Sequence, residues 1–186
     1  MRRLLTAVLP LALAACASAP RPPASPPAAR APAAAPAPGL AAVGTAQEAA
    51  AALASASGSL VSGRVTLLPV EGGVRVSGEI GGLVRNGAHG LEVHERGDCS
   101  AADASSAGAY FDPAAGAEQR GVVVGGNRDR IVADAEGVAR VDLRIPGAVL
   151  GGGAPNDIAG RALVVMGATP GAFGARVACG PIRVTR

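Results

Sequence analysis

The stretch IVADAEGVARVDLRI, residues 131–145, decides the fold class of this chain. From residue 140 onward it alternates charged with apolar side chains, the period-two pattern of a strand with one buried face. A short apolar run at 131–133 precedes this strand. Residues 134–137 between the two have the composition of a hairpin turn, since Gly137 is free to adopt a positive φ. We therefore predict two strands joined by a tight turn.

The same alternation recurs elsewhere in the chain. Val74, Val76 and Ile80 alternate with polar side chains, and residues 162–166 are continuously apolar, as in a strand covered on both faces. The chain holds 27 glycines, and turn signals recur about every ten residues. These features predict an all-β sandwich or flattened barrel.

The first fifteen residues have the pattern of a targeting segment rather than of a folded domain. Arg2 and Arg3 precede an apolar run that is too short to span a bilayer. Residues 13–16, Leu-Ala-Ala-Cys, are similar to a bacterial lipobox, in which the Cys16 sulfur takes the lipid. We expect a lipoprotein signal peptide over 1–15 and a lipidated Cys16.

After export, lipid on Cys16 would anchor the protein to the membrane of the cell envelope. Ala17 follows the cysteine, and this favours the outer membrane, with the protein facing the periplasm. An ordinary secretory signal with an incidental cysteine remains the alternative.

Residues 16–44 are almost entirely Ala and Pro, which predicts a disordered, semi-extended linker. The remaining residues, 45–186, are of a length expected for one domain. The net charge of +3 is misleading, because four of the seventeen arginines lie in the first 30 residues and leave thirteen against fourteen acidic residues. With one Tyr, two Phe and no Trp, the chain lacks a basic, aromatic nucleic-acid surface, so no nucleic-acid partner is expected.

Six segments in the second half of the chain form a recognisable series. They are His89-Gly-Leu-Glu-Val-His-Glu95, Gly97-Asp-Cys-Ser100, Ser106-Ala-Gly-Ala-Tyr-Phe-Asp-Pro113, Ile131-Val-Ala-Asp-Ala-Glu-Gly-Val-Ala139, Gly160-Arg-Ala-Leu-Val-Val165 and Ala175-Arg-Val-Ala-Cys-Gly180. In these segments, their order and nearly their spacing, the chain from about Gly58 onward resembles the copper/zinc superoxide dismutases. The resemblance implies an eight-stranded Greek-key β-barrel.

One segment conflicts with this fold. Residues 46–56 are nearly all alanine, which intrinsic propensity assigns to a helix. The resemblance places the first strand of the barrel at about 50–55. We expect the strand, because pairing within a sheet can override propensity.

The resemblance also implies an intrasubunit disulfide between Cys99 and Cys179. This pairing suits an exported protein, since Cys16 is then the third and lipidated cysteine. Two free buried thiols remain the alternative.

The family holds copper on four histidines, whereas this chain has two histidines in total. His94 matches one copper ligand, but Glu92, Tyr110 and Met166 stand at the other three positions. His89 matches a family histidine that is not a ligand. A carboxylate, one imidazole, a phenol and a thioether suit no single copper oxidation state.

The family's zinc ligands are three histidines, one of them shared with copper, and an aspartate. Tyr110 takes the shared position, and Glu118, Val124 and Asn127 match the other three. Val124 offers no donor atom, so zinc is not expected. Arg176 matches the family's anion-guiding arginine, and we expect it to hold a loop through backbone carbonyls instead.

We therefore favour a non-catalytic, superoxide dismutase-like lipoprotein, an envelope scaffold or binding protein with no cofactor. One alternative is a copper storage or delivery protein that uses His94, Glu92, Met166 and Tyr110. Another is an atypical superoxide dismutase. The expected partners are the membrane, through Cys16, and an unidentified envelope protein or a second copy of the chain.

Overall fold

The computed structural model describes residues 39–119, 130–168 and 174–186, and these all fall within one compact unit, Ala37–Arg186. Across these ranges it has eleven strands and one short 3-10 helix, and no helix long and apolar enough to cross a membrane. The elements are β1 Ala49–Ser55, β2 Ser62–Val70, β3 Gly73–Gly81, β4 Ala88–His94, η1 Ser105–Ala107, β5 Tyr110–Asp112, β6 Ala117–Gln119, β7 Arg130–Val132, β8 Ala139–Pro146, β9 Ala162–Met166, β10 Arg176–Pro181 and β11 Arg183–Val184.

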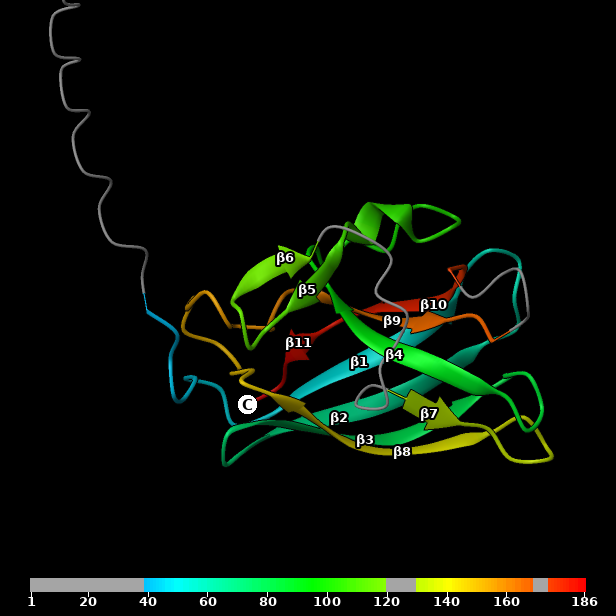
Figure 1. Cartoon of the computed structure of the whole chain (residues 1–186), viewed down its shortest axis with the longest axis horizontal. Helices are drawn as coiled ribbons and strands as arrows, with labels where there is room; N and C mark the ends of the chain where they lie inside the picture. Colours follow the sequence, from blue (N-terminus) through cyan, green and yellow to red (C-terminus); the bar gives the residue numbers. More distant parts are fainter. Residues whose placement is uncertain (1–38, 120–129, 169–173) are drawn as a thin grey trace, which may run out of the picture. The chain divides into compact units, whose positions relative to one another are not determined.

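All the strand pairs are antiparallel and follow the order β6-β5-β4-β9-β10-β1-β2-β3-β8, with β7 on β4 and β11 on β1. Residues 131–145 form β7, a turn and β8, but the two strands are not the paired hairpin that the sequence predicts. The strand β7 pairs with β4 and β8 pairs with β3, so the turn links the strand beside β4 with the strand beside β3 (Figure 1). The sheet thereby curls back on itself. This architecture confirms the all-β, Greek-key barrel expectation.

The turn between β7 and β8 is built by one aspartate. The Asp134 amide donates to the Val138 carbonyl, and the Asp134 carboxylate accepts from the amides of Glu136 and Val138. Gly137 has a φ of +81°, as the turn requires. The sequence therefore predicted this turn from the residues that make it.

The alternation of apolar residues also gives the observed burial. Val74, Val76 and Ile80 are fully buried in β3, and their polar neighbours face outward. In β9 the residues Ala162, Leu163, Val164 and Val165 are all fully buried, so this strand is covered on both faces as predicted.

The alanine-rich segment forms strand β1, as expected from the resemblance. Its backbone pairs with β2 on one side and with β10 and β11 on the other, and these tertiary hydrogen bonds outweigh helix propensity. The packing beside it is tight. A Cβ at Gly180 would lie 2.4 Å from the Ala52 carbonyl oxygen, so the neighbouring strand needs a glycine at that point.

The segment ahead of β1 is fastened to the barrel by Asn156, whose side chain is 1% exposed. Its Oδ1 accepts from the Ala41 amide, and its Nδ2 donates to the carbonyls of Ala41 and Gly147. Residues near Ala41, which the sequence assigned to the linker, therefore already contact the barrel.

Candidate metal centre

The candidate centre lies at the end of β4, where Glu92 and His94 point to the same side of the strand. The residues that alternate with them, Leu91 and Val93, are part of the main hydrophobic core on the other side. Glu92 and His94 are buried, at 4% and 2% exposure, and Glu92 Oε2 lies 3.5 Å from His94 Nε2. A carboxylate and an imidazole therefore face each other in a space that excludes water.

The hydrogen bonds of His94 fix the state of its ring. Nδ1 lies 3.0 Å from the Gly108 carbonyl oxygen, and because a carbonyl only accepts, Nδ1 must carry a proton. Nε2 has no hydrogen-bond partner among the described residues. When the ring is neutral, the Nε2 lone pair is therefore the atom turned toward Glu92.

The Gly108 carbonyl is itself held from a second side. Arg176, at the start of β10, donates from Nη2 to the Gly108 carbonyl at 2.6 Å and from Nη1 to the Ala104 carbonyl at 2.7 Å. The guanidinium thus binds backbone of the loop that carries the acceptor of His94.

The same loop is bonded covalently to β10. Cys99 and Cys179 form a disulfide across 80 residues, with an S–S distance of 2.06 Å. This confirms the expected pairing and excludes the alternative of two free thiols.

Met166 ends β9 beside the same face of β4. A Cβ added at Gly90 would lie 3.2 Å from Glu92 Oε1 and 3.3 Å from Met166 Cγ. The carboxylate and the thioether side chain therefore approach the same glycine from two strands. Gly90 leaves the space that lets both lie against β4.

His89 occupies the other end of β4 and is fully engaged. Its Nε2 accepts from the Val84 amide at 3.3 Å, and its Nδ1 lies 2.8 Å from the Met166 carbonyl oxygen. Since Nε2 accepts and the carbonyl needs a donor, Nδ1 carries the proton. Neither nitrogen is left to bind a metal ion.

The remaining candidate ligands from the sequence lie in β5, in β6 or outside the described residues. Tyr110, in β5, pairs directly across from His94 in the backbone register. Glu118 lies in β6, and the structure gives no account of its side chain. Val124 and Asn127 lie outside the described residues.

Comparison with known proteins decides the family. The copper/zinc superoxide dismutase (SODC) family profile matches residues 61–182. The superoxide dismutase [Cu-Zn] of Caulobacter vibrioides is 36% identical over 150 residues, which span 72% of this chain and 85% of that relative. This chain belongs to the copper/zinc superoxide dismutase family.

The metals of that family do not fit the described residues. No group of three or more His, Cys, Asp or Glu side chains converges within residues 39–119, 130–168 and 174–186. One of the chain's two histidines has both ring nitrogens hydrogen-bonded, which leaves only His94 to present an imidazole lone pair. A copper site of four imidazoles cannot be assembled from this superoxide dismutase chain.

Two contacts near the site carried no signal in the sequence. Arg161 stacks 3.4 Å above the Phe111 ring and donates to the backbone carbonyls of Asp157 and Glu95. The acceptor of His94 is likewise a backbone oxygen, that of Gly108. Residue identity does not reveal backbone acceptors, so sequence reasoning missed both.

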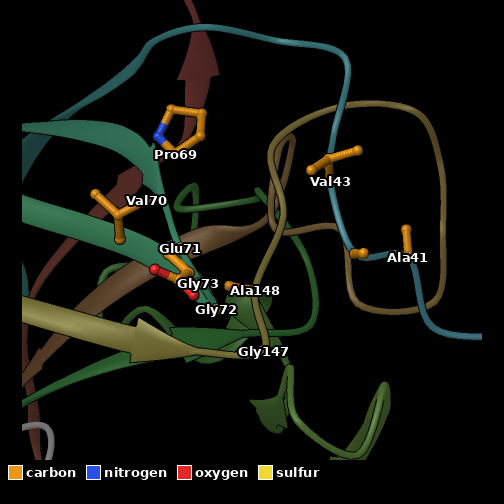
Figure 2. A pocket seen from close by; sticks show the side chains of 10 residues that line it. Ala41, Val43, Pro69, Val70, Glu71, Gly72, Gly73, Gly147 and Ala148 are labelled. Atoms are coloured by element: carbon orange, nitrogen blue, oxygen red, sulfur yellow. The ribbon is translucent and has the colours of Figure 1, made fainter.

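The groove in Figure 2 lies away from this centre. Ala41–Val43 form one wall, and the turn between β2 and β3 with Gly147 and Ala148 forms the other. Its lining is mostly apolar and includes one titratable side chain, that of Glu71. The groove therefore offers none of the donors of the candidate centre.

Proposed function

We propose that this member of the superoxide dismutase family is a lipid-anchored, non-catalytic protein of the cell envelope, serving as a scaffold or binding module. The observation that carries the proposal is the buried Glu92–His94 contact. The one imidazole lone pair of the centre faces a carboxylate at 3.5 Å, inside a dry space.

The chemistry of this donor set supports a non-catalytic role. Dismutation at copper requires one site to hold both Cu(I) and Cu(II), and imidazole suits both states. Here the one available imidazole faces a hard carboxylate, and the soft thioether of Met166 lies farther along β4, beside Gly90. Carboxylate and thioether donors favour opposite oxidation states of copper. A single proton on either partner would turn the Glu92–His94 contact into an ion pair or a hydrogen bond, without any metal ion.

The barrel has an apolar core and a covalent link of its own. Fully buried aliphatic side chains from β2, β3, β4 and β9 fill it, and the disulfide ties β10 to the loop beside the candidate centre. A core of this kind is suited to a scaffold. Its attachment to a membrane is inferred from the lipobox-like residues 13–16 and the Ala/Pro-rich linker after them.

The test is a copper titration of the purified chain, with Cu(I) and Cu(II) measured separately, followed by a dismutase assay of the loaded and unloaded protein. We expect no stoichiometric copper after weakly bound ions are removed, and no dismutase activity. Variants H94A and M166L serve as matched controls. One tightly held ion that is lost in either variant, together with activity, would contradict the proposal.

A second function, copper storage or delivery, is favoured by one specific observation. His94 Nε2 is buried without a hydrogen-bond partner among the described residues, and the Met166 and Glu92 side chains both lie close to Gly90 on the same strand. Cu(I) accepts few ligands and prefers thioether and imidazole donors. Binding of Cu(I) but not Cu(II), without dismutase activity, would select this function.

A further inference from the structure

The outer face of the sheet formed by β11, β1, β2, β3 and β8 carries a concentration of arginines. We call it the arginine face and define it by Arg64, Arg75, Arg140, Arg144 and Arg183, all of which are exposed. These strands are consecutive neighbours in the sheet (Figure 1). The face lies on the opposite side of these strands from their buried core residues.

Backbone register shows that the arginines share one surface. Arg64 pairs with Glu79, which pairs with Arg140, so these three outward side chains form one row across β2, β3 and β8. In a second row Arg75 pairs directly with Arg144. Like charges directly opposite in a sheet are destabilising, so the fold gains nothing from this placement.

The two carboxylates on the face are both engaged with arginines. Asp142 accepts from Nε and Nη2 of Arg75, each at 2.7 Å, and Glu79 Oε1 lies 3.6 Å from Arg140 Nε. The hydrogen bonds and charge of Arg75 lower the pKa of Asp142. Both carboxylates are therefore already engaged by arginines of the same face.

Three arginines of the face have no carboxylate partner in the described part of the chain. Arg144 donates to the Glu71 backbone carbonyl, which leaves its charge uncompensated, and neither Arg64 nor Arg183 forms an ion pair. With five arginines against two carboxylates the face is basic. The chain from residue 44 onward has thirteen arginines and fourteen acidic residues, so the rest of the domain is acidic.

The side chains between the arginines are short. Ala50, Ala52, Thr66 and Ser77 face outward on β1, β2 and β3, so the guanidinium groups project beyond them. Five strands spaced about 4.8 Å apart make a surface roughly 20 Å wide. Such a surface is complementary to a plane of phosphate groups, which arginine binds in bidentate fashion.

We propose that the arginine face docks the domain onto an anionic phospholipid surface. The choice of a membrane as partner rests on the proposed function, because lipid on Cys16 would keep the domain close to a bilayer. Tethering raises the effective concentration of lipid, so a weak electrostatic contact is enough to hold the domain down.

The test measures binding to vesicles of phosphatidylcholine alone and of phosphatidylcholine with phosphatidylglycerol, using the full chain carrying C16S. This variant cannot be lipidated, so the result does not depend on anchoring, and the signal segment is common to all samples. The double variant R64E/R144E removes unpaired charge from the face. The control R85E/R130E makes the same change in charge at two exposed arginines outside it.

We expect tighter binding to the anionic vesicles, weakened by salt. We also expect a loss of at least about 25-fold in R64E/R144E, since each basic residue near an anionic surface is worth about fivefold. The control should lose far less. Equal losses in the two double variants, or no preference for anionic vesicles, would overturn the proposal.

Binding to an anionic polysaccharide but not to vesicles would also overturn it and would assign the face to a polymer. Copper binding or dismutase activity would leave this inference intact while contradicting the proposed function, so the two failures are distinguishable.

Discussion

The two histidines of this chain sit on one strand, five residues apart, and differ in almost every physical respect. Both ring nitrogens of His89 form hydrogen bonds with backbone groups, and these bonds join the β3–β4 connection to the end of β9. In His94, Nδ1 bonds to the Gly108 carbonyl, whereas Nε2 faces Glu92 and has no hydrogen-bond partner among the described residues. The first has the bonding of a structural residue, whereas the second keeps a ring nitrogen that faces Glu92.

The largest effect should come from the disulfide, because it holds only the His94 end. Removing it in C99A/C179A should lower the free energy of unfolding by roughly 4 kcal/mol in the chain-entropy model, given the separation of 80 residues. Amide hydrogen exchange should show lost protection at Arg96 and Gly108, whose amides bond within the loop. Ala133, at the other end of β4, should lose protection only through the lower global stability and therefore less than these two amides. An equal loss at both ends would contradict the difference.

The next effect separates the histidines directly. H89L removes both hydrogen bonds that the buried His89 ring makes, to the Val84 amide and to the Met166 carbonyl, and should cost about 3 kcal/mol of unfolding free energy. Denaturant unfolding of the purified variant measures this cost.

The matched control replaces the buried pair at the other end, as E92L/H94L. This variant removes both members of the buried pair at once, and the Gly108 carbonyl keeps its hydrogen bond from Arg176. The free energy of unfolding should therefore stay within about 1 kcal/mol of the parent. If the pair variant proves as unstable as H89L, His94 is a structural residue too.

The smallest effect is expected in acid. Hydrogen bonds from Ser100 lower the pKa of Asp98, and hydrogen bonds from Ser105 lower the pKa of Asp103, both in the loop beside His94. Carboxyls with lowered pKa stabilise the fold above their unfolded value, near 3.8, and lose that contribution as the pH falls through the folded value.

Protection of the Gly108 amide should therefore fall in acid sooner than that of Ala133, and D103N should reduce the difference. Hydrogen exchange between about pH 5 and pH 3 measures it. Simultaneous loss at both amides would show that these carboxyls do not act locally.

Turns and strands were predictable where a short local pattern of residues was enough to determine them. Asp134 and Gly137 make the turn they predict, and Val74 to Ile80 bury the residues that alternation selects. Strand β1 needed the resemblance, because alanine favours a helix until β2 and β10 pair with it.

The candidate site was predictable only as a set of residue types. The resemblance assigned Glu92 and His94 to two positions of one copper site, and Arg176 was expected to bind backbone carbonyls of a loop, as it does. The sequence gave no sign that the Gly108 carbonyl would fix the proton of His94, or that Arg176 would bind that same oxygen. Backbone acceptors depend on how the loop folds, and short-range patterns do not encode them.

The Asn156 clamp has a mechanical consequence. The Asn156 side chain forms three hydrogen bonds with Ala41 and Gly147. A pulling force applied to the chain ahead of Ala41 therefore acts on these bonds before it acts on β1. Such a load is shared with the loop between β8 and β9, and the alanine strand at the barrel's centre is shielded from it. Asn156 therefore passes force from the chain ahead of Ala41 to the loop between β8 and β9.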